Sequence, residues 1–390
     1  MERLQCDILI VGGGVIGLSA ARALLGSSKR RPTRASSPLN LILVEREASL
    51  GHHASSRNSE VLHAGMYYAP HSQKASFCVR GRHLLKQYLE QSHIGFRECG
   101  KWIVASNRDQ LESLEDLHQR GIMNGVEGLE LITANAAKKR EPWLKVDGGV
   151  LVSHHTAIFD SHGLIKALTR DVKAQGGQIC TQHELTHVEV KSSGGISALI
   201  KCQGEEIQVE AQQLVNATGY WTSKWSSMLG GSLPKVQIRY ALGRYWSLRG
   251  QSPTHRLIYP LPEDGGLGIH LTVDLHNRAR FGPDVKWLSI SSANKLDMID
   301  YAVDTNSFEH FKTAIQMYWP TLDPARIHPD YAGLRVKAYV DGRPLNDFVL
   351  LGPEQHGLEG VVHLMGIESP GLTSCLALGE WVSDTLTYVP

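Results

Sequence analysis

The first fifty residues alternate between short apolar runs and glycine-rich or polar segments. One apolar run predicts a buried strand over residues 6–11, and residues 12–17, with four glycines, follow at once. Residues 18–25 are rich in alanine and leucine and predict a helix. Residues 26–40 lack apolar periodicity and are rich in serine and basic residues, which predicts a solvent loop. Residues 41–45 then predict a second buried strand.

The middle of the chain carries a second signal of α/β type. Asp160 can cap a helix whose apolar positions fall on one face. Short alternating runs at residues 185–190, 196–202 and 207–209 predict a meander, and residues 214–219 end it as a strand that delivers a small-residue turn. Elsewhere the middle of the chain is richer in aromatic residues and histidine, which predicts a separate layer over the first.

Composition narrows the class of protein. The chain has 390 residues, and its 40 basic and 39 acidic residues leave a formal charge of +1. This balance gives no electrostatic reason to expect a nucleic acid or an anionic membrane as partner. Six scattered cysteines without a C-x-x-C pair predict neither a disulfide framework nor a metal site. No apolar stretch approaches the roughly 20 residues of a membrane-spanning helix, which leaves room only for peripheral membrane contact, and no mitochondrial presequence is visible.

The glycines at positions 12, 14 and 17 form the pattern of a dinucleotide-binding turn. In this motif the first glycine makes the tight turn, the second lets backbone N–H groups approach a pyrophosphate, and the third lets the helix pack on the strand. Glu45 ends the next strand, where a carboxylate can accept both ribose hydroxyls. Glu45 lies 28 residues after Gly17, beyond the usual spacing of about 20, and the predicted loop accounts for the excess. A purely structural glycine turn is the alternative.

Two later segments favour FAD over NAD. Residues 214–219 are the type of late strand that returns to the dinucleotide in flavoproteins, although any core strand ending in a turn has this appearance. Residues 366–373 form a Gly/Ser/Pro turn before an apolar helix. Such a helix N-terminus offers N–H groups and a positive dipole to an electron-rich flavin carbonyl.

Candidate chemistry concentrates in residues 55–68, where hydroxyls, an amide and His63 follow the ribose-binding strand. An imidazole with an unperturbed pKa near 6.5 can accept a proton at neutral pH, so His63 is a candidate general base and His270 its competitor. Arg335 offers a guanidinium fork that suits a carboxylate. The alternatives are a structural histidine and a solvated arginine.

The glycine turn, residues 216–219 and residues 331–335 are similar to the FAD-dependent D-amino-acid-oxidase-like superfamily. More closely, nearly the whole chain resembles the L-2-hydroxyglutarate dehydrogenase family, with the most specific segments at residues 56–68, 74–85, 100–105, 259–283 and 366–374. The resemblance implies an α/β fold in which a Rossmann-like FAD-binding domain (1–65, 150–235 and 335–390) is interleaved with a mixed-sheet α+β substrate domain (66–149 and 236–334).

The resemblance also implies site residues. The expected catalytic residues are His63, Arg335 and His270, without a metal. The expected FAD-binding residues are Gly12, Gly14, Val15, Ile16, Gly17, Glu45, Arg46, Ser56, Asn58, Ser59, Val188, Ala217, Gly219, Gly366, Ser369, Pro370, Gly371, Leu372 and Thr373. The expected substrate-binding residues are Tyr68, Arg244, Tyr259, His270, Arg335 and Lys337.

The implied activity is the FAD-dependent oxidation of L-2-hydroxyglutarate, a small dicarboxylate, to 2-oxoglutarate. An amine or amino-acid oxidase of the same superfamily and a non-catalytic dinucleotide-binding protein are the alternatives, and covalent attachment of the flavin through His63 is a further one. The electron acceptor, whether a quinone, a flavoprotein carrier or oxygen, is not fixed by the sequence. The family implies a mitochondrial location, with a cytoplasmic one as the alternative.

Overall fold

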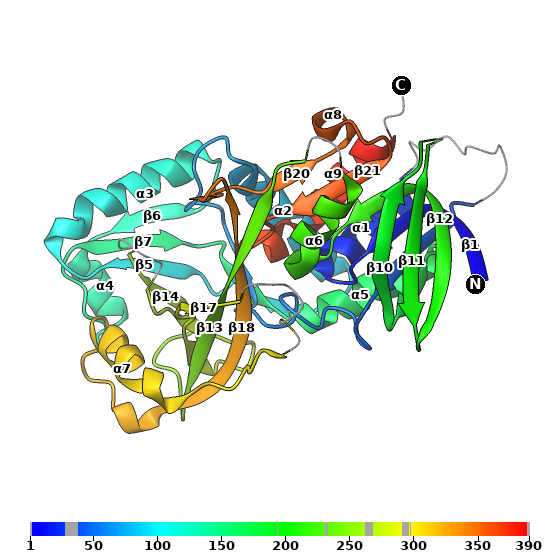
Figure 1. Ribbon diagram of the computed structural model, residues 1–390. Coiled ribbons are helices and arrows are strands. Elements are labelled where there is room, and N and C mark those ends of the chain that lie inside the picture. The colour runs from blue at the N-terminus through cyan, green and yellow to red at the C-terminus, as the bar shows by residue number, and fades with distance from the viewer. Residues whose placement is uncertain are drawn as a thin grey trace.

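Two large sheets lie side by side in the molecule, and the longest strands of the second sheet lie on its side toward the first (Figure 1). The structure, a computed structural model, describes residues 2–27, 38–192, 194–230, 233–261, 268–290, 296 and 298–387. Part of the predicted loop at 26–40, namely residues 28–37, therefore lies outside the described residues.

The first sheet has eight strands in the described part of the chain. Its strands are β1 (Glu2–Val11), β2 (Leu41–Glu45), β9 (Gln178–Thr181), β10 (His183–Val190), β11 (Ile196–Cys202), β12 (Glu205–Asn216), β20 (Val349–Leu351) and β21 (Val361–Met365). At its centre β9, β2, β1, β12 and β21 run parallel. The carboxyl ends of β1, β2 and β12 therefore meet at one edge, where parallel α/β sheets bind their ligands.

Parallel strands buried on both faces explain the continuous apolar runs of the sequence. Ile8 and Ile10 of β1 pack into one hydrophobic core, and Leu9 and Val11 into another. The first core lies under α1 (Val15–Gly26), α2 (Gln73–Gln91), α5 (Ser161–Ala174) and α9 (Gly371–Thr387). The second core is closed by the β10–β12 meander and by α6 (Thr222–Leu229), while α8 (Pro353–His356) lies near β20.

The second sheet is mixed and has ten strands among the described residues. Its strands are β5 (Lys101–Ala105), β6 (Leu129–Ile132), β7 (Gly149–Ser153), β13 (Val236–Leu248), β14 (Leu257–Pro260), β15 (Leu271–Val273), β16 (Ala279–Phe281), β17 (Lys286–Leu288), β18 (Ile327–Val340) and β19 (Arg343–Pro344). Helices α3 (Leu111–Met123), α4 (Ala134–Arg140) and α7 (Phe308–Gln316) lie around it (Figure 1). A third, small sheet has the order β3 (Val61–Leu62), β8 (Ala157–Phe159) and β4 (Phe96–Arg97).

The local predictions hold where periodicity is strong. Residues 41–45 and 196–202 form β2 and β11, and Asp160 caps α5 by accepting a hydrogen bond from the Gly163 N–H. Residues 205–216 form one strand, however, so the predicted break between 209 and 214 is wrong. β1 pairs with β12 almost throughout, which holds the polar residues at that break extended.

The division into two interleaved domains remains a prediction. The sheets nevertheless suggest where its boundaries belong, because β7 and the second half of β18 lie in the ten-stranded sheet. Both segments had been assigned to the FAD-binding domain, at the starts of 150–235 and 335–390. In the structure β7 pairs with β5 and β18 pairs with β13, so both segments belong to the ten-stranded sheet.

Candidate active site

A cavity of about 1020 Å³ is lined by residues from both large sheets. At one end it reaches Gly12 and Glu45 at the carboxyl edge of the first sheet, and elsewhere it reaches His63 and Arg335. This volume is at the upper end of the range of about 300–1,000 Å³ for small-molecule and cofactor sites. The cavity is therefore large enough for a dinucleotide together with a small substrate.

The glycine turn closes the nucleotide end through its backbone. Gly12 has a φ of +109°, and a Cβ placed there would lie 2.4 Å from the carbonyl oxygen of Ala217. A Cβ on Gly17 would lie 1.9 Å from the carbonyl oxygen of Gly12. Only glycine fits at these two positions, because both bring α1 and β12 against the turn. Gly17 thus shapes the turn and does not itself line the cavity.

Glu45 is held in place at the end of β2. Its side chain is 9% exposed, and its carboxylate accepts hydrogen bonds from the N–H groups of Gly13 at 2.7 Å and Glu47 at 2.9 Å. Burial raises the pKa of this carboxyl group above its usual value, while the two N–H groups act in the opposite direction. The fixed acceptor at this edge suits the ribose hydroxyls of a dinucleotide.

Residues 55–59 brace the start of α1 and the wall of the cavity. The Ser55 hydroxyl accepts a hydrogen bond from the Val15 N–H at 3.1 Å. The Asn58 amide donates to the carbonyl oxygen of Ser55 at 2.9 Å, and the Ser59 hydroxyl lies 2.7 Å from that of Tyr245. Sequence reasoning selected Ser56, but Ser55 lines the cavity and Ser56 does not.

His63 lies at the other end, after β3. Its backbone N–H donates to the Thr373 hydroxyl at 3.0 Å, while its ring Nδ1 is buried without a hydrogen-bond partner in the described part of the chain. Burial, assisted by the positive charge of Lys101, lowers the pKa of His63 to about 3. The imidazole is therefore neutral at physiological pH, which is the form that a general base requires, and its pKa lies well below the unperturbed value near 6.5.

The turn before α9 closes the cavity beside His63. Ser369, Pro370 and Gly371 line the cavity. Glu368 accepts hydrogen bonds from the ammonium groups of Lys74 at 2.7 Å and Lys337 at 2.8 Å. Lys337 therefore lines the cavity with its charge already paired, which argues against its predicted role as the cation for a second carboxylate.

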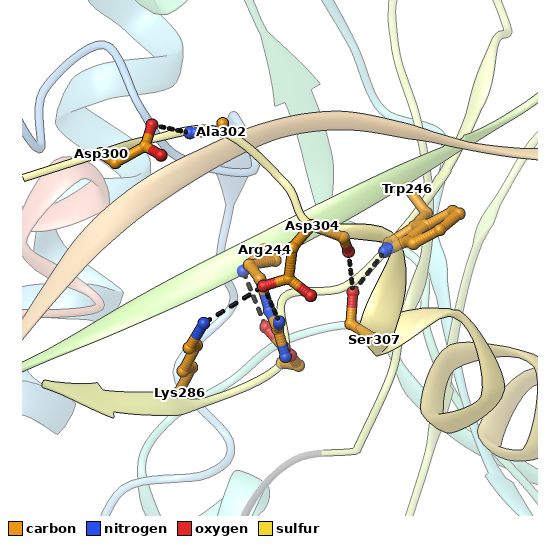
Figure 2. Close-up of polar contacts among 8 residues, drawn as sticks. Arg244, Trp246, Lys286, Asp300, Ala302, Asp304 and Ser307 are labelled. Atoms are coloured by element: carbon orange, nitrogen blue, oxygen red, sulfur yellow. Dashed lines mark hydrogen bonds and ion pairs between the residues drawn. The ribbon is translucent and has the colours of Figure 1, made fainter.

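Arg244 and Arg335 were both expected to bind substrate, but only one of them is paired with carboxylates. Arg244 donates to Asp284 and Asp304. Figure 2 shows it beside Asp304, which also accepts a hydrogen bond from Lys286. It does not line the cavity, so the structure argues against a role in substrate binding. Arg335 lines the cavity and has no ion pair among the described residues. Its stem crosses Gly243, where a Cβ would lie 3.1 Å from the Arg335 Cδ.

His270 and Tyr259 form a stacked pair in the cavity wall. Their ring centroids lie 3.5 Å apart with planes 11° from parallel, and the side chains are 5% and 2% exposed. His270 thus remains a competitor of His63 by position, but its ring is held flat against a tyrosine.

Most of the predicted residues meet at this cavity. Those that line it are Gly12, Gly14, Val15, Ile16, Glu45, Arg46, Asn58, Ser59, His63, Ala217, Gly219, Tyr259, His270, Arg335, Lys337, Ser369, Pro370, Gly371 and Leu372. Those outside its lining are Gly17, Ser56, Tyr68, Val188, Arg244, Gly366 and Thr373.

The outside positions have physical reasons. Val188 belongs to β10, and its side chain is fully buried in the second hydrophobic core. Thr373 is fully buried as well, and its hydroxyl accepts a hydrogen bond from the His63 backbone N–H. Tyr68 hydrogen-bonds the side chain of Ser369, which does line the cavity. Gly366 has a φ of +65°, which the turn before α9 requires.

Sequence reasoning did not select Lys101 as a site residue. Lys101 begins β5, is 1% exposed, and lies beside His63. Only its position directly before the apolar run at residues 102–105 could have pointed to it.

The family described as "FAD dependent oxidoreductase" matches residues 7–385. A mitochondrial L-2-hydroxyglutarate dehydrogenase of Arabidopsis thaliana is 33% identical, over 97% of this chain and 83% of the relative. An L-2-hydroxyglutarate dehydrogenase of Indibacter alkaliphilus is 26% identical, over 98% of each chain. The fold is similar to that of L-alpha-glycerophosphate oxidase from Mycoplasma pneumoniae with FAD bound, with a TM-score of 0.84 and 23% identity, over 100% of this chain and 96% of that one.

No helix within the described residues combines the length and apolar character needed to cross a membrane. Those residues also hold no group of three or more histidine, cysteine or acidic side chains arranged to hold a metal ion.

Proposed function

The chain belongs to the family of FAD-dependent oxidoreductases, and we propose that it oxidises L-2-hydroxyglutarate to 2-oxoglutarate. The observation that carries the proposal is the pairing of an uncompensated arginine, Arg335, with a neutral histidine, His63, in one cavity. A 2-hydroxy acid needs both a cation for its carboxylate and an acceptor for its hydroxyl proton. The relatives from a plant and a bacterium support this substrate over 2-amino acids.

The cavity fits FAD. The backbone of the Gly12–Gly14 turn is open to a pyrophosphate, Glu45 presents a fixed carboxylate, and the turn at residues 369–371 leads into the N-terminus of α9. When bound, FAD would supply the hydride acceptor for the oxidation at C2 of the substrate, and this redox chemistry would belong to the cofactor.

The residues of the chain position the substrate and move its proton. The Arg335 guanidinium can hold the C1 carboxylate with two parallel N–H···O bonds, which fixes the direction of C2. A neutral imidazole at His63 can take the hydroxyl proton as the hydride leaves. The contact from Thr373 fixes the backbone that carries this imidazole. His270 is the competing base, and its stacking on Tyr259 limits the ring orientations available to it.

Anaerobic mixing of the flavin-loaded protein with a panel of acids tests the proposal. We expect L-2-hydroxyglutarate to bleach the flavin and to yield 2-oxoglutarate without ammonia. L-glutamate, D-2-hydroxyglutarate and L-lactate should bleach it far more slowly. Rapid bleaching by L-glutamate with release of ammonia would establish an amino-acid oxidase. No bleaching by any acid would leave only a dinucleotide-binding role.

Location and electron acceptor belong to the same proposal. A mitochondrial location rests on the names of eukaryotic relatives such as that of Arabidopsis thaliana, and a cytoplasmic one is the alternative. The bacterial relative argues that the chemistry does not depend on the organelle. A quinone, a flavoprotein carrier and oxygen are the candidate acceptors, and reoxidation rates of the reduced protein with each would rank them.

A further inference from the structure

Lys101 is a buried cation next to the reaction end of the cavity. Its side chain is 1% exposed, and its ammonium lies 4.6 Å from the ring centroid of Tyr67 and 4.8 Å from that of Tyr259. No hydrogen bond or ion pair reaches it from the described residues. Tyr259 and His63 line the cavity, so Lys101 lies one layer of side chains behind its wall.

The groups around Lys101 supply no negative charge. Burial raises the pKa of the Cys78 thiol to about 12 and that of the Cys99 thiol to about 11. Burial also raises the pKa of Tyr67 and Tyr259 above their usual value, and His63 is neutral. All of these groups are uncharged at neutral pH. The faces of two aromatic rings offset only part of the cost of burying an ammonium group without a counter-ion.

Two further polar atoms near Lys101 lack partners. The Tyr67 hydroxyl and the His63 Nδ1 are buried and make no hydrogen bond within the described chain. Buried polar groups in native proteins are nearly always satisfied, so several unsatisfied ones together require an explanation. A negatively charged ligand group in the adjoining cavity would compensate the charge of Lys101 and would lie next to His63, which lines that cavity.

The proposed substrate needs a second cation, since it carries two carboxylates. Arg335 accounts for one of them. Arg244 is occupied by Asp284 and Asp304, and Lys337 by Glu368. We propose that Lys101 is the second cation of the substrate site and draws the distal carboxylate to the His63–Tyr259 side of the cavity. This inference rests on the proposed function and names the residue that selects a dicarboxylate.

The proposal predicts a pH dependence. Burial lowers the pKa of Lys101 to about 7. Lys101 is therefore charged below this pH and loses its charge above it, while both substrate carboxylates stay ionised. Binding of the dicarboxylate should weaken as the pH rises through neutrality. A bound dianion favours the charged form and moves the change to higher pH.

The experiment compares holoenzymes of the wild type, Lys101→Met and Lys101→Arg on two substrates. L-2-hydroxyglutarate carries the distal carboxylate, and L-2-hydroxypentanoate has the same chain length without it. We expect Lys101→Met to reduce the preference for the dicarboxylate by about 10- to 100-fold, mainly through KM, because one charge acts across a water-excluded wall. Lys101→Arg should keep the preference and abolish the pH dependence of KM.

The control is Lys138→Met, which removes the same charge from an exposed pair with Asp147. It should change neither the preference nor its pH dependence. An unchanged preference in Lys101→Met would overturn the proposal. If that variant loses its flavin, the wild type still decides, because a ratio of the two KM values that stays constant from pH 6 to 9 contradicts the proposal. If the wild type does not oxidise L-2-hydroxyglutarate at all, the proposed function is refuted, and not only the role of Lys101.

Discussion

The two ends of the cavity are built in different ways. At the nucleotide end, the turns after β1, β2 and β12 meet at one edge of a parallel sheet, and Glu45 already has backbone donors for its carboxylate. At the reaction end, His63, Lys101 and Arg335 come from distant segments, and each has an uncompensated charge or an unsatisfied polar atom. The first end is preorganised to hold a cofactor, whereas the second lacks the negative charges that a substrate brings.

The strongest test of the nucleotide end is Gly14→Val. A Cβ at this position would already lie 3.0 Å from the Ser55 hydroxyl, and a branched side chain would block backbone approach to a pyrophosphate. We expect the purified variant to lack FAD and all activity, as measured by flavin absorbance. Gly26→Ala is the control, because its Cβ meets Gln175 at an acceptable 3.4 Å. Full flavin content in Gly14→Val, or colourless wild-type protein that binds NAD, would refute the site.

At the reaction end, Arg335→Met should leave flavin content intact and remove carboxylate binding. Charge-assisted hydrogen bonds contribute about 1.5 to 3 kcal/mol each, so the loss of two should lower kcat/KM by well over a hundredfold. Steady-state kinetics on folded, flavin-loaded protein measures this loss. Arg335→Lys keeps the charge without the fork and should recover part of it. Near-normal kcat/KM in Arg335→Met would exclude the role.

Arg244→Met tests the difference between the two arginines, because Arg244 is paired with Asp284 and Asp304 whereas Arg335 has no ion pair among the described residues. Its removal leaves Asp284, which is 5% exposed, without its cation. Breaking a buried pair in this way costs about 3 to 5 kcal/mol of unfolding free energy. Denaturant unfolding should show the loss, whereas the preference for a dicarboxylate in the surviving folded protein should stay as in the wild type. A lost preference with unchanged stability would return Arg244 to the substrate site.

The core of the first sheet adds a smaller effect of pH on stability. His363 is fully buried, and burial together with the nearby His356 lowers its pKa to about 3. The unfolded chain takes up this proton near pH 6.5, so stability is complete above that pH and falls as the pH decreases toward 3. The expected loss is about 2 kcal/mol at pH 5. His363→Asn should reduce this slope between pH 7 and 5, and an unchanged slope would assign the acid sensitivity to other groups.

The same contrast explains what the sequence could predict. The roles of Gly17 and Glu45 depend on backbone geometry within one strand–turn–helix–strand unit, which a spacing pattern records. The positive charge of Arg244 is paired because of Asp284 and Asp304, which lie 40 and 60 residues away in the sequence. The family-like segment at residues 331–335 singled out Arg335, but no local pattern around Arg244 records that its charge is paired.

Lys101 could not be predicted for the same reason. A lysine directly before an apolar strand is typical of a strand that begins at the surface. Its burial follows from Tyr67 and Tyr259, which arrive from other segments of the fold. The lowered pKa of His63 also depends on tertiary burial and on Lys101, which no local pattern around residue 63 records.

The most direct test of which histidine is the general base is the rate of anaerobic flavin reduction by L-2-hydroxyglutarate in His63→Asn and His270→Asn. Loss of a general base costs about 10² to 10⁴ in rate, whereas loss of a packing histidine costs stability. We predict that His63→Asn keeps FAD and fold yet reduces its flavin at least a hundredfold more slowly than the wild type, and that His270→Asn stays much closer to the wild-type rate. Reduction of His63→Asn at the wild-type rate, with slow reduction in His270→Asn, would contradict this account and assign the base to His270.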